Sequence, residues 1–283
     1  ADRLVPLRAL AESELPQVVS VVSEAVRQNG ALPGVSSRYF AYSLLAGHET
    51  TARFQTKVSS LQGALRGLPP TNSFVKTDEV FHPFAALYAV LETGRNFFPS
   101  DNTLAGKQAA LEQAFRDKGL DEQTIAQSKT AAQDIARSIL DYAAGDGFQR
   151  LAARVRPGAA ANPATLNTDA LQGAEMTGNP YRPFFIENAQ PFALPAPAPF
   201  DTSSGSAFMA TVREVYDFRR NQTAEQWEIA RFWDAGTTTL AGHWLSICSA
   251  VCVEKKVPFN QALRAHAITA LAVTPRLSAG ATR

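Results

Sequence analysis

Two stretches, separated by residues 201–222, decide the fold of this chain: NPYRPFFIENAQPFALPAPAPF at residues 179–200 and TAEQWEIARFWDAGTTTLAGHW at residues 223–244. The first is rich in proline, whose ring fixes φ and removes an N–H donor, so it predicts an extended arm. The second opens with a capping box, in which the Thr223 hydroxyl and the Gln226 amide satisfy two backbone N–H groups that a helix start leaves unpaired. The sequence therefore predicts an extended arm followed by a Trp-rich amphipathic helix.

Apolar residues recur at helical spacing on both sides of this region. Before the arm, the pattern predicts helices over 14–28, from a cap at Ser36 or Ser37 to about His48, over 80–93 and 104–118, and from Asp121 to about Tyr142. After the arm, it predicts helices from a cap at Ser204 or Ser206 to Tyr216, from the capping box onward, and over 241–253 and 259–273. No alternating strand pattern exceeds a few residues. The predicted class is all-α, a multi-helix bundle with the long Pro-rich arm wrapping it.

The composition changes along the chain and divides it into three parts. Residues 156–178 are dominated by Ala, Pro, Asn, Thr and Gly, as in a surface connection. We therefore expect an N-terminal helical region at 1–155, a linker and Pro-rich arm at 156–201, and a C-terminal helical region at 202–283. At 283 residues the chain is near the size at which single cores stop growing, and we expect one compact body.

The net charge and the hydropathy of the chain argue against nucleic-acid binding and against a membrane span. The net charge is +1 with no dense basic cluster, which argues against nucleic-acid binding. No run reaches the roughly 18 apolar residues of a membrane span, so we expect a soluble protein without one. The first residue is Ala1, which is consistent with a removed secretory peptide, and we expect a secreted or periplasmic location.

Cysteine and histidine residues give no metal-binding pattern. Cys248 and Cys252 are four residues apart in an apolar helical stretch, where they fit small buried hydrophobic residues better than a ligand pair or a disulfide. His82, His243 and His266 lie in separate segments without Asp or Glu at ligand offsets, as structural histidines do. The sequence therefore predicts no metal ligands.

A further motif surrounds His48 and Glu49. LLAGHETTA, residues 44–52, looks like the oxygen-activating helix of haem-thiolate monooxygenases, but neither cysteine has the Gly-rich loop that such a haem ligand needs. A metalloprotease helix would need a second histidine at position 52, which is Ala. Core packing is the better interpretation of this segment.

Five short motifs occur in an order that resembles one superfamily: Arg182-Pro183-Phe184, Glu225-Gln226, Ile229-Ala230, Phe232-Trp233 and Gly242-His243-Trp244. This order is similar to that in vanadium-dependent haloperoxidases and their relatives among type-2 phosphatidic acid phosphatases. SRYFAYSLLAGHETTARF, residues 37–54, takes the place of a packed helix in this resemblance, which extends over residues 32–271. The resemblance implies an all-helical scaffold in which Gly242-His243-Trp244 is a turn and not part of the site.

The same resemblance implies a site that this chain lacks. The superfamily holds vanadate or phosphate with a Lys and an Arg-Pro on one helix, a Pro-Ser-Gly-His turn, and a Ser-Arg followed by His, which together neutralise an oxyanion. Here Arg156-Pro157 and Arg182-Pro183 lack the upstream Lys, and Ser37-Arg38 is followed by a histidine only at position 48. We therefore expect no catalytic and no cofactor-binding residue in this chain, and vanadate or phosphate only if a further part supplies the site.

Two hypotheses follow. In the first, the chain is the scaffold part of a haloperoxidase-like or acid-phosphatase-like enzyme whose catalytic half is lost by truncation or supplied by a second polypeptide. Loss of the resemblance at Val273 motivates it, with residues 274–283 as an out-of-frame tail, and it predicts an exposed apolar face. In the second, the chain is a non-catalytic helical interaction module that acts as a closed monomer or a homo-oligomer.

Overall fold

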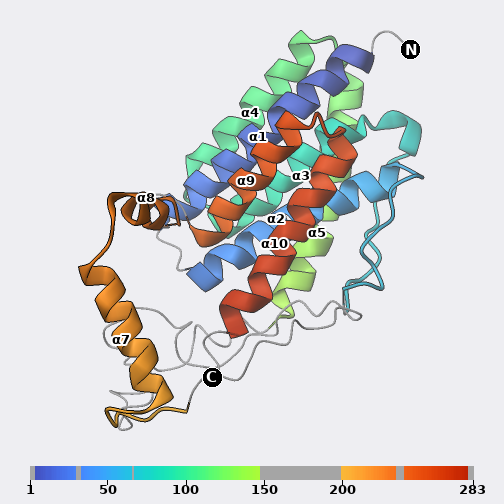
Figure 1. The fold of residues 1–283 in the computed structure, drawn as a ribbon. Helices are drawn as coiled ribbons and strands as arrows, with labels where there is room; N and C mark the ends of the chain where they lie inside the picture. The colour runs from blue at the N-terminus through green and yellow to red at the C-terminus, as the bar shows by residue number, and fades with distance from the viewer. Residues whose placement is uncertain (1–3, 30–32, 66, 147–198, 234–238, 280–283) are drawn as a thin grey trace.

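The computed structural model of the chain describes residues 4–29, 33–65, 67–146, 199–233 and 239–279 (Figure 1). Within these residues the regular structure is helical, without strands and with a single isolated bridge between Gln62 and Leu65. The predicted all-α class is confirmed. Residues 156–198 lie outside the described residues, so the linker, the wrapping Pro-rich arm and the three-part division remain predictions.

The described α-helices vary in length from ten to 25 residues. In chain order they are α1 (Leu4–Gln28), α2 (Pro33–Phe54), the short 3₁₀ turn η1 (Thr77–Glu79), α3 (His82–Phe97), α4 (Asn102–Asp117), α5 (Glu122–Ala144), α7 (Ala207–Arg220), α8 (Ala224–Trp233), α9 (Leu240–Glu254) and α10 (Phe259–Ala279). None of the described helices combines the length and the apolar character that crossing a membrane would require.

Helix α3 lies at the centre of the bundle. Every residue from Pro83 to Gly94 is buried, which is the pattern of a helix surrounded on all sides. Helix α2 packs against α3, α5 and α10, while α1 and α4 cover another side of α3 (Figure 1). The largest fully buried side chains, including Phe40, Phe84 and Phe115, come from α1 to α5 and form one continuous core.

The close contact between α2 and α3 depends on Gly47. A Cβ atom at this position would lie 2.5 Å from Val90 Cγ2 and 3.2 Å from the carbonyl oxygen of Ala86, both on α3. These distances leave no room for a methyl group without a shift of the packed helices. Gly47 therefore sets how near the two central helices approach.

Several predicted helix limits are wrong, for identifiable reasons. Helix α1 begins at Leu4 instead of residue 14, because Leu7 and Ala11 continue its buried face. Helix α2 begins at Pro33, a residue suited to the first helical position, so Ser36 and Ser37 are buried inside the helix instead of capping it. Gly242-His243-Trp244 belongs to the first turns of α9, which Thr239 caps by accepting from Gly242 N–H, and is not a turn between elements.

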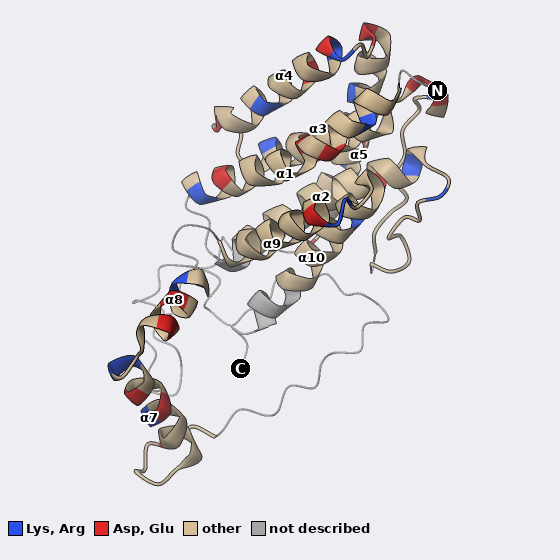
Figure 2. Cartoon of the chain, turned by 45° about the horizontal axis from the view of Figure 1, so that its top comes forward, with Lys and Arg blue, Asp and Glu red and all other residues tan. Residues whose placement is uncertain are grey.

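Helices α7 and α8 lie to one side of the bundle (Figures 1 and 2). Neither helix has a buried residue. Their caps are well formed, however. Ser206 caps α7 by accepting from Met209 N–H, and Thr223 and Gln226 exchange the two hydrogen bonds of the predicted capping box. Local signals therefore start both helices without support from a core.

Candidate functional site

His48 and Glu49, the pair that resembles an active-site motif, hold a loop in place. His48 Nε2 lies 3.2 Å from the carbonyl oxygen of Ser59, and the Glu49 carboxylate accepts from Ser60 Oγ at 2.6 Å and from Leu61 N–H at 2.8 Å. Burial lowers the pKa of His48 to about 4 and raises the pKa of Glu49 above its usual value. A carbonyl only accepts, so Nε2 of the neutral imidazole carries the proton.

Arg38, considered above as part of an anion-binding Ser-Arg pair, is engaged inside the fold. Its Nε donates to Asp146 Oδ2 at 2.6 Å, and its Nη2 donates to the carbonyl oxygen of Ala143 at 3.0 Å. Tyr42 Oη donates to the same carboxylate oxygen at 3.0 Å, and burial followed by the charge of Asp146 raises the pKa of Tyr42. This buried network ties α2 to the end of α5. Arg156-Pro157 and Arg182-Pro183 lie outside the described residues.

The four histidines occupy different surroundings. His82 Nδ1 lies 3.1 Å from Gln55 Nε2, and burial lowers the pKa of His82 to about 4. The ring of His243 meets Phe232 edge-on at 4.8 Å and Trp233 at 5.3 Å between ring centroids. The structure thus joins two of the motifs in the resemblance, Phe232-Trp233 and Gly242-His243-Trp244, in one aromatic cluster.

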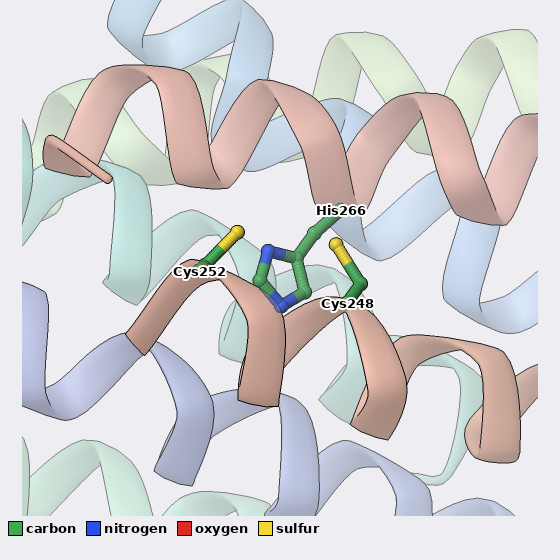
Figure 3. Close-up of side chains that lie close together, drawn as sticks. All are labelled: Cys248, Cys252 and His266. Atoms are coloured by element: carbon green, nitrogen blue, oxygen red, sulfur yellow. The ribbon is translucent and has the colours of Figure 1, made fainter. Parts of the chain in front are cut away.

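His266 lies beside the two cysteines. Cys248 and Cys252 on α9 and His266 on α10 place their sulfur and ring nitrogen atoms within 4.8 Å of one another, and the imidazole lies between the two sulfurs (Figure 3). Both cysteines are free thiols. Sequence reasoning missed this cluster. The four-residue spacing puts both thiols on one helix face, but only the packing of α10 on α9 adds the histidine.

Large apolar side chains remain exposed on α7, α8 and α9, and we call this set the exposed apolar face. Its members are 42% to 64% exposed. They are Val212, Val215, Tyr216 and Phe218 on α7, Trp227, Ile229, Phe232 and Trp233 on α8, and Trp244, Val251 and Val253 on α9. Helix α9 carries no charged residue before Glu254 (Figure 2). Exposed apolar patches of this kind mark interaction surfaces.

Comparison with solved structures gives one informative relative. The chain superposes on a bacterial vanadium-dependent iodoperoxidase with a TM-score of 0.79 and 24% sequence identity, covering 95% of this chain and 68% of the iodoperoxidase chain. No protein-family model and no curated protein matches the chain. At this identity the likeness establishes the fold alone, which this chain shares with the iodoperoxidase.

Proposed function

We propose that this chain is the helical scaffold of a vanadium haloperoxidase-like or acid-phosphatase-like enzyme and that a further part, of the same or of a second polypeptide, supplies the vanadate- or phosphate-binding residues. The observation that carries the proposal is the shared fold, which covers 95% of this chain but only 68% of the iodoperoxidase. The remainder of the iodoperoxidase has no counterpart in this chain. The expected reaction of the assembled enzyme is vanadate-assisted halide oxidation or phosphomonoester hydrolysis.

The chemistry of the bound anion supports the proposal that its binding residues come from a further part. A vanadate or phosphate oxyanion needs converging cations and hydrogen-bond donors in a fixed geometry. The sequence lacks the three motifs that provide them in the superfamily. Arg38, which stands in a Ser-Arg pair, donates instead to Asp146 and to Ala143.

The exposed apolar face supports docking of this further part. Tryptophan and phenylalanine anchors supply much of the energy of protein interfaces when they are desolvated at the centre. Helix α8 offers Trp227, Phe232 and Trp233 in a single short segment, all about half exposed. Burial of these side chains by a partner would also stabilise α7 and α8, neither of which has a fully buried residue.

The test is co-expression of the full chain with the part of the iodoperoxidase that has no counterpart here. We expect vanadate binding, followed by vanadium NMR, and halide oxidation in the co-expressed complex but not in the chain alone. The double substitution of Trp227 and Ile229 by Ser should prevent assembly, whereas Glu228→Ser on the same helix should not. Vanadate-dependent turnover by the chain alone would contradict the proposal, as would a stable complex without vanadate binding.

The alternative function is a non-catalytic interaction module, and the same exposed apolar face favours it. In that case the face would pair with its copy in a symmetric dimer, because self-complementary patches close most readily with two-fold symmetry. Light scattering measures the molar mass of the chain in solution, and a dimer of the chain alone would distinguish this function from the first. A dimer that the Trp227 and Ile229 substitutions dissociate, together with absent vanadate binding in every mixture, would establish the alternative.

A further inference from the structure

The cluster of Cys248, Cys252 and His266 combines the donor types of a thiolate-rich metal site. Two sulfurs and one imidazole nitrogen lie within 4.8 Å of one another, on two helices that pack directly together (Figure 3). His266 is fully buried and Cys252 is 9% exposed, so the side chains are held by packing. Thiolate and imidazole are the preferred ligands of Zn²⁺ and similar borderline-soft cations.

The protonation of His266 suits metal binding. Its Nδ1 lies 2.7 Å from the carbonyl oxygen of Ala262, which can only accept, so Nδ1 carries the proton and Nε2 carries the lone pair. A histidine that binds a metal typically donates its other N–H in this way, which fixes the tautomer and the ring orientation. Nε2 lies 2.8 Å from Ser249 Oγ, a hydroxyl that can rotate away when an ion binds.

A cavity gives the cluster access to solvent. It has a volume of about 340 Å³ and lies where α1 meets α9 and α10, and both Cys252 and His266 line it. Glu12 and Ser13 of α1 line the same cavity and offer oxygen atoms. Zinc sites with three protein ligands keep a fourth position for water or another ligand. The cavity can hold that water.

We propose that Cys248, Cys252 and His266 bind one Zn²⁺ ion, or a cation of the same borderline-soft class, with the fourth position open to the cavity. Two thiolates neutralise the charge of the ion, which permits its burial. Burial and the neighbouring Cys252 raise the pKa of the free Cys248 thiol to about 11, so binding at neutral pH must displace thiol protons. The site is independent of the vanadate chemistry proposed above.

The test uses the reduced full chain after treatment with a chelator. We expect one Zn²⁺ bound per chain in equilibrium dialysis, with release of about two protons per ion. Co²⁺ should give the intense thiolate charge-transfer absorption and visible bands of a tetrahedral site. Cys248→Ser and Cys252→Ser, which change little volume, should each weaken zinc binding at least about tenfold, and loss of His266 should do the same.

Ser249→Ala is the matched control, because this residue lies between the two cysteines and bonds to His266 without being a ligand. It should bind zinc at least as tightly as the unsubstituted chain, since Nε2 loses its competing partner. Circular dichroism checks that each variant is folded. Binding that is unchanged in both serine variants, or absent from the folded unsubstituted chain, would overturn the proposal.

Discussion

The buried Arg38–Asp146 pair is the residue-scale feature with the largest expected effect on stability. The side chains of Arg38 and Asp146 are 6% and 3% exposed. Asp146→Ala would leave the arginine charge buried beside Tyr42, and we expect a loss of about 3–5 kcal/mol in the free energy of unfolding. Urea denaturation measures it. Glu122→Ala is the control, since Glu122 pairs with Arg116 on the surface, and its unfolding midpoint should stay nearly unchanged.

His48 predicts a pH dependence of stability. Its pKa falls from 6.5 to about 4 on folding because burial disfavours the imidazolium, so the folded state binds fewer protons than the unfolded state between these values. The stability contribution is complete above pH 6.5 and is lost as the pH falls towards 4. The loss at pH 4.5 is on the order of 2–3 kcal/mol.

His48→Gln keeps an N–H donor for the carbonyl oxygen of Ser59 but does not titrate. Between pH 7 and pH 4.5 the variant should therefore lose about 2–3 kcal/mol less stability than the unsubstituted chain. Paired urea titrations at the two pH values measure this difference. Equal losses in the two proteins would show that His48 is not the group responsible.

At the same scale, the sequence predicted that His48 and Glu49 lie in the core but not what they bond to. Their partners, Ser59 to Leu61, lie in a loop without apolar periodicity, and such contacts leave no pattern in the sequence. The cluster around His266 could not be predicted from the sequence for a related reason. Its residues come from two helices whose packing depends on the whole core.

At the scale of elements, Gly47 and Gly106 form a natural pair for a packing experiment. Both lie inside helices, but a Cβ at Gly47 would lie 2.5 Å from Val90 Cγ2, whereas a Cβ at Gly106 would meet nothing within 4 Å. Gly47→Ala should destabilise the protein by about 1–3 kcal/mol through overpacking. Gly106→Ala should stabilise it by up to about 1 kcal/mol, the gain in helix propensity.

Thermal unfolding of both variants checks the sign of each effect. If Gly47→Ala proved as stable as Gly106→Ala, α2 and α3 would not be as tightly packed as described. Both substitutions replace Gly by Ala inside a helix, so the gain in intrinsic helix propensity is the same in both. The difference between the two changes in stability therefore measures the packing at the two sites.

The helices that local signals start were predicted well. Asp121 caps α5, Ser206 caps α7, and Thr223 with Gln226 caps α8, each as the sequence indicates. Helices α1 and α2 begin earlier than predicted, because tertiary packing extends the first and Pro33 starts the second without a polar cap. Local chemistry determines a helix end only where the side chain that caps it is short and polar.

At the scale of the whole molecule, the bundle and the α7–α8 segment should open independently. Helix α3 is buried from Pro83 to Gly94, while α7 and α8 have no buried residue. Amides of α7 and α8 should exchange with solvent far faster than those of α3, and Gly47→Ala should accelerate exchange in the bundle helices, α2 and α3 among them, but not in α7 or α8. Exchange that accelerates equally in α8 would show that the two parts unfold together.

The sequence predicted the helical class and, through the resemblance, a fold that the iodoperoxidase shares at 24% identity, because helix periodicity survives where most residues differ. Function was harder to predict, since it resides in particular residues placed on a shared fold. The exposed apolar face was an expectation of the scaffold hypothesis, and its position on α7, α8 and α9 became known only from the packing.

That face also governs how the protein behaves in concentrated solution. With a formal net charge of +1 and an isoelectric point near 8.0, copies of the chain repel one another only weakly at neutral pH. Weak repulsion and bare tryptophan side chains together favour colloidal self-attraction. Solubility should therefore be lowest near pH 8 and rise in mildly acidic buffers, down to the pH at which protonation of the buried histidines begins to unfold the bundle.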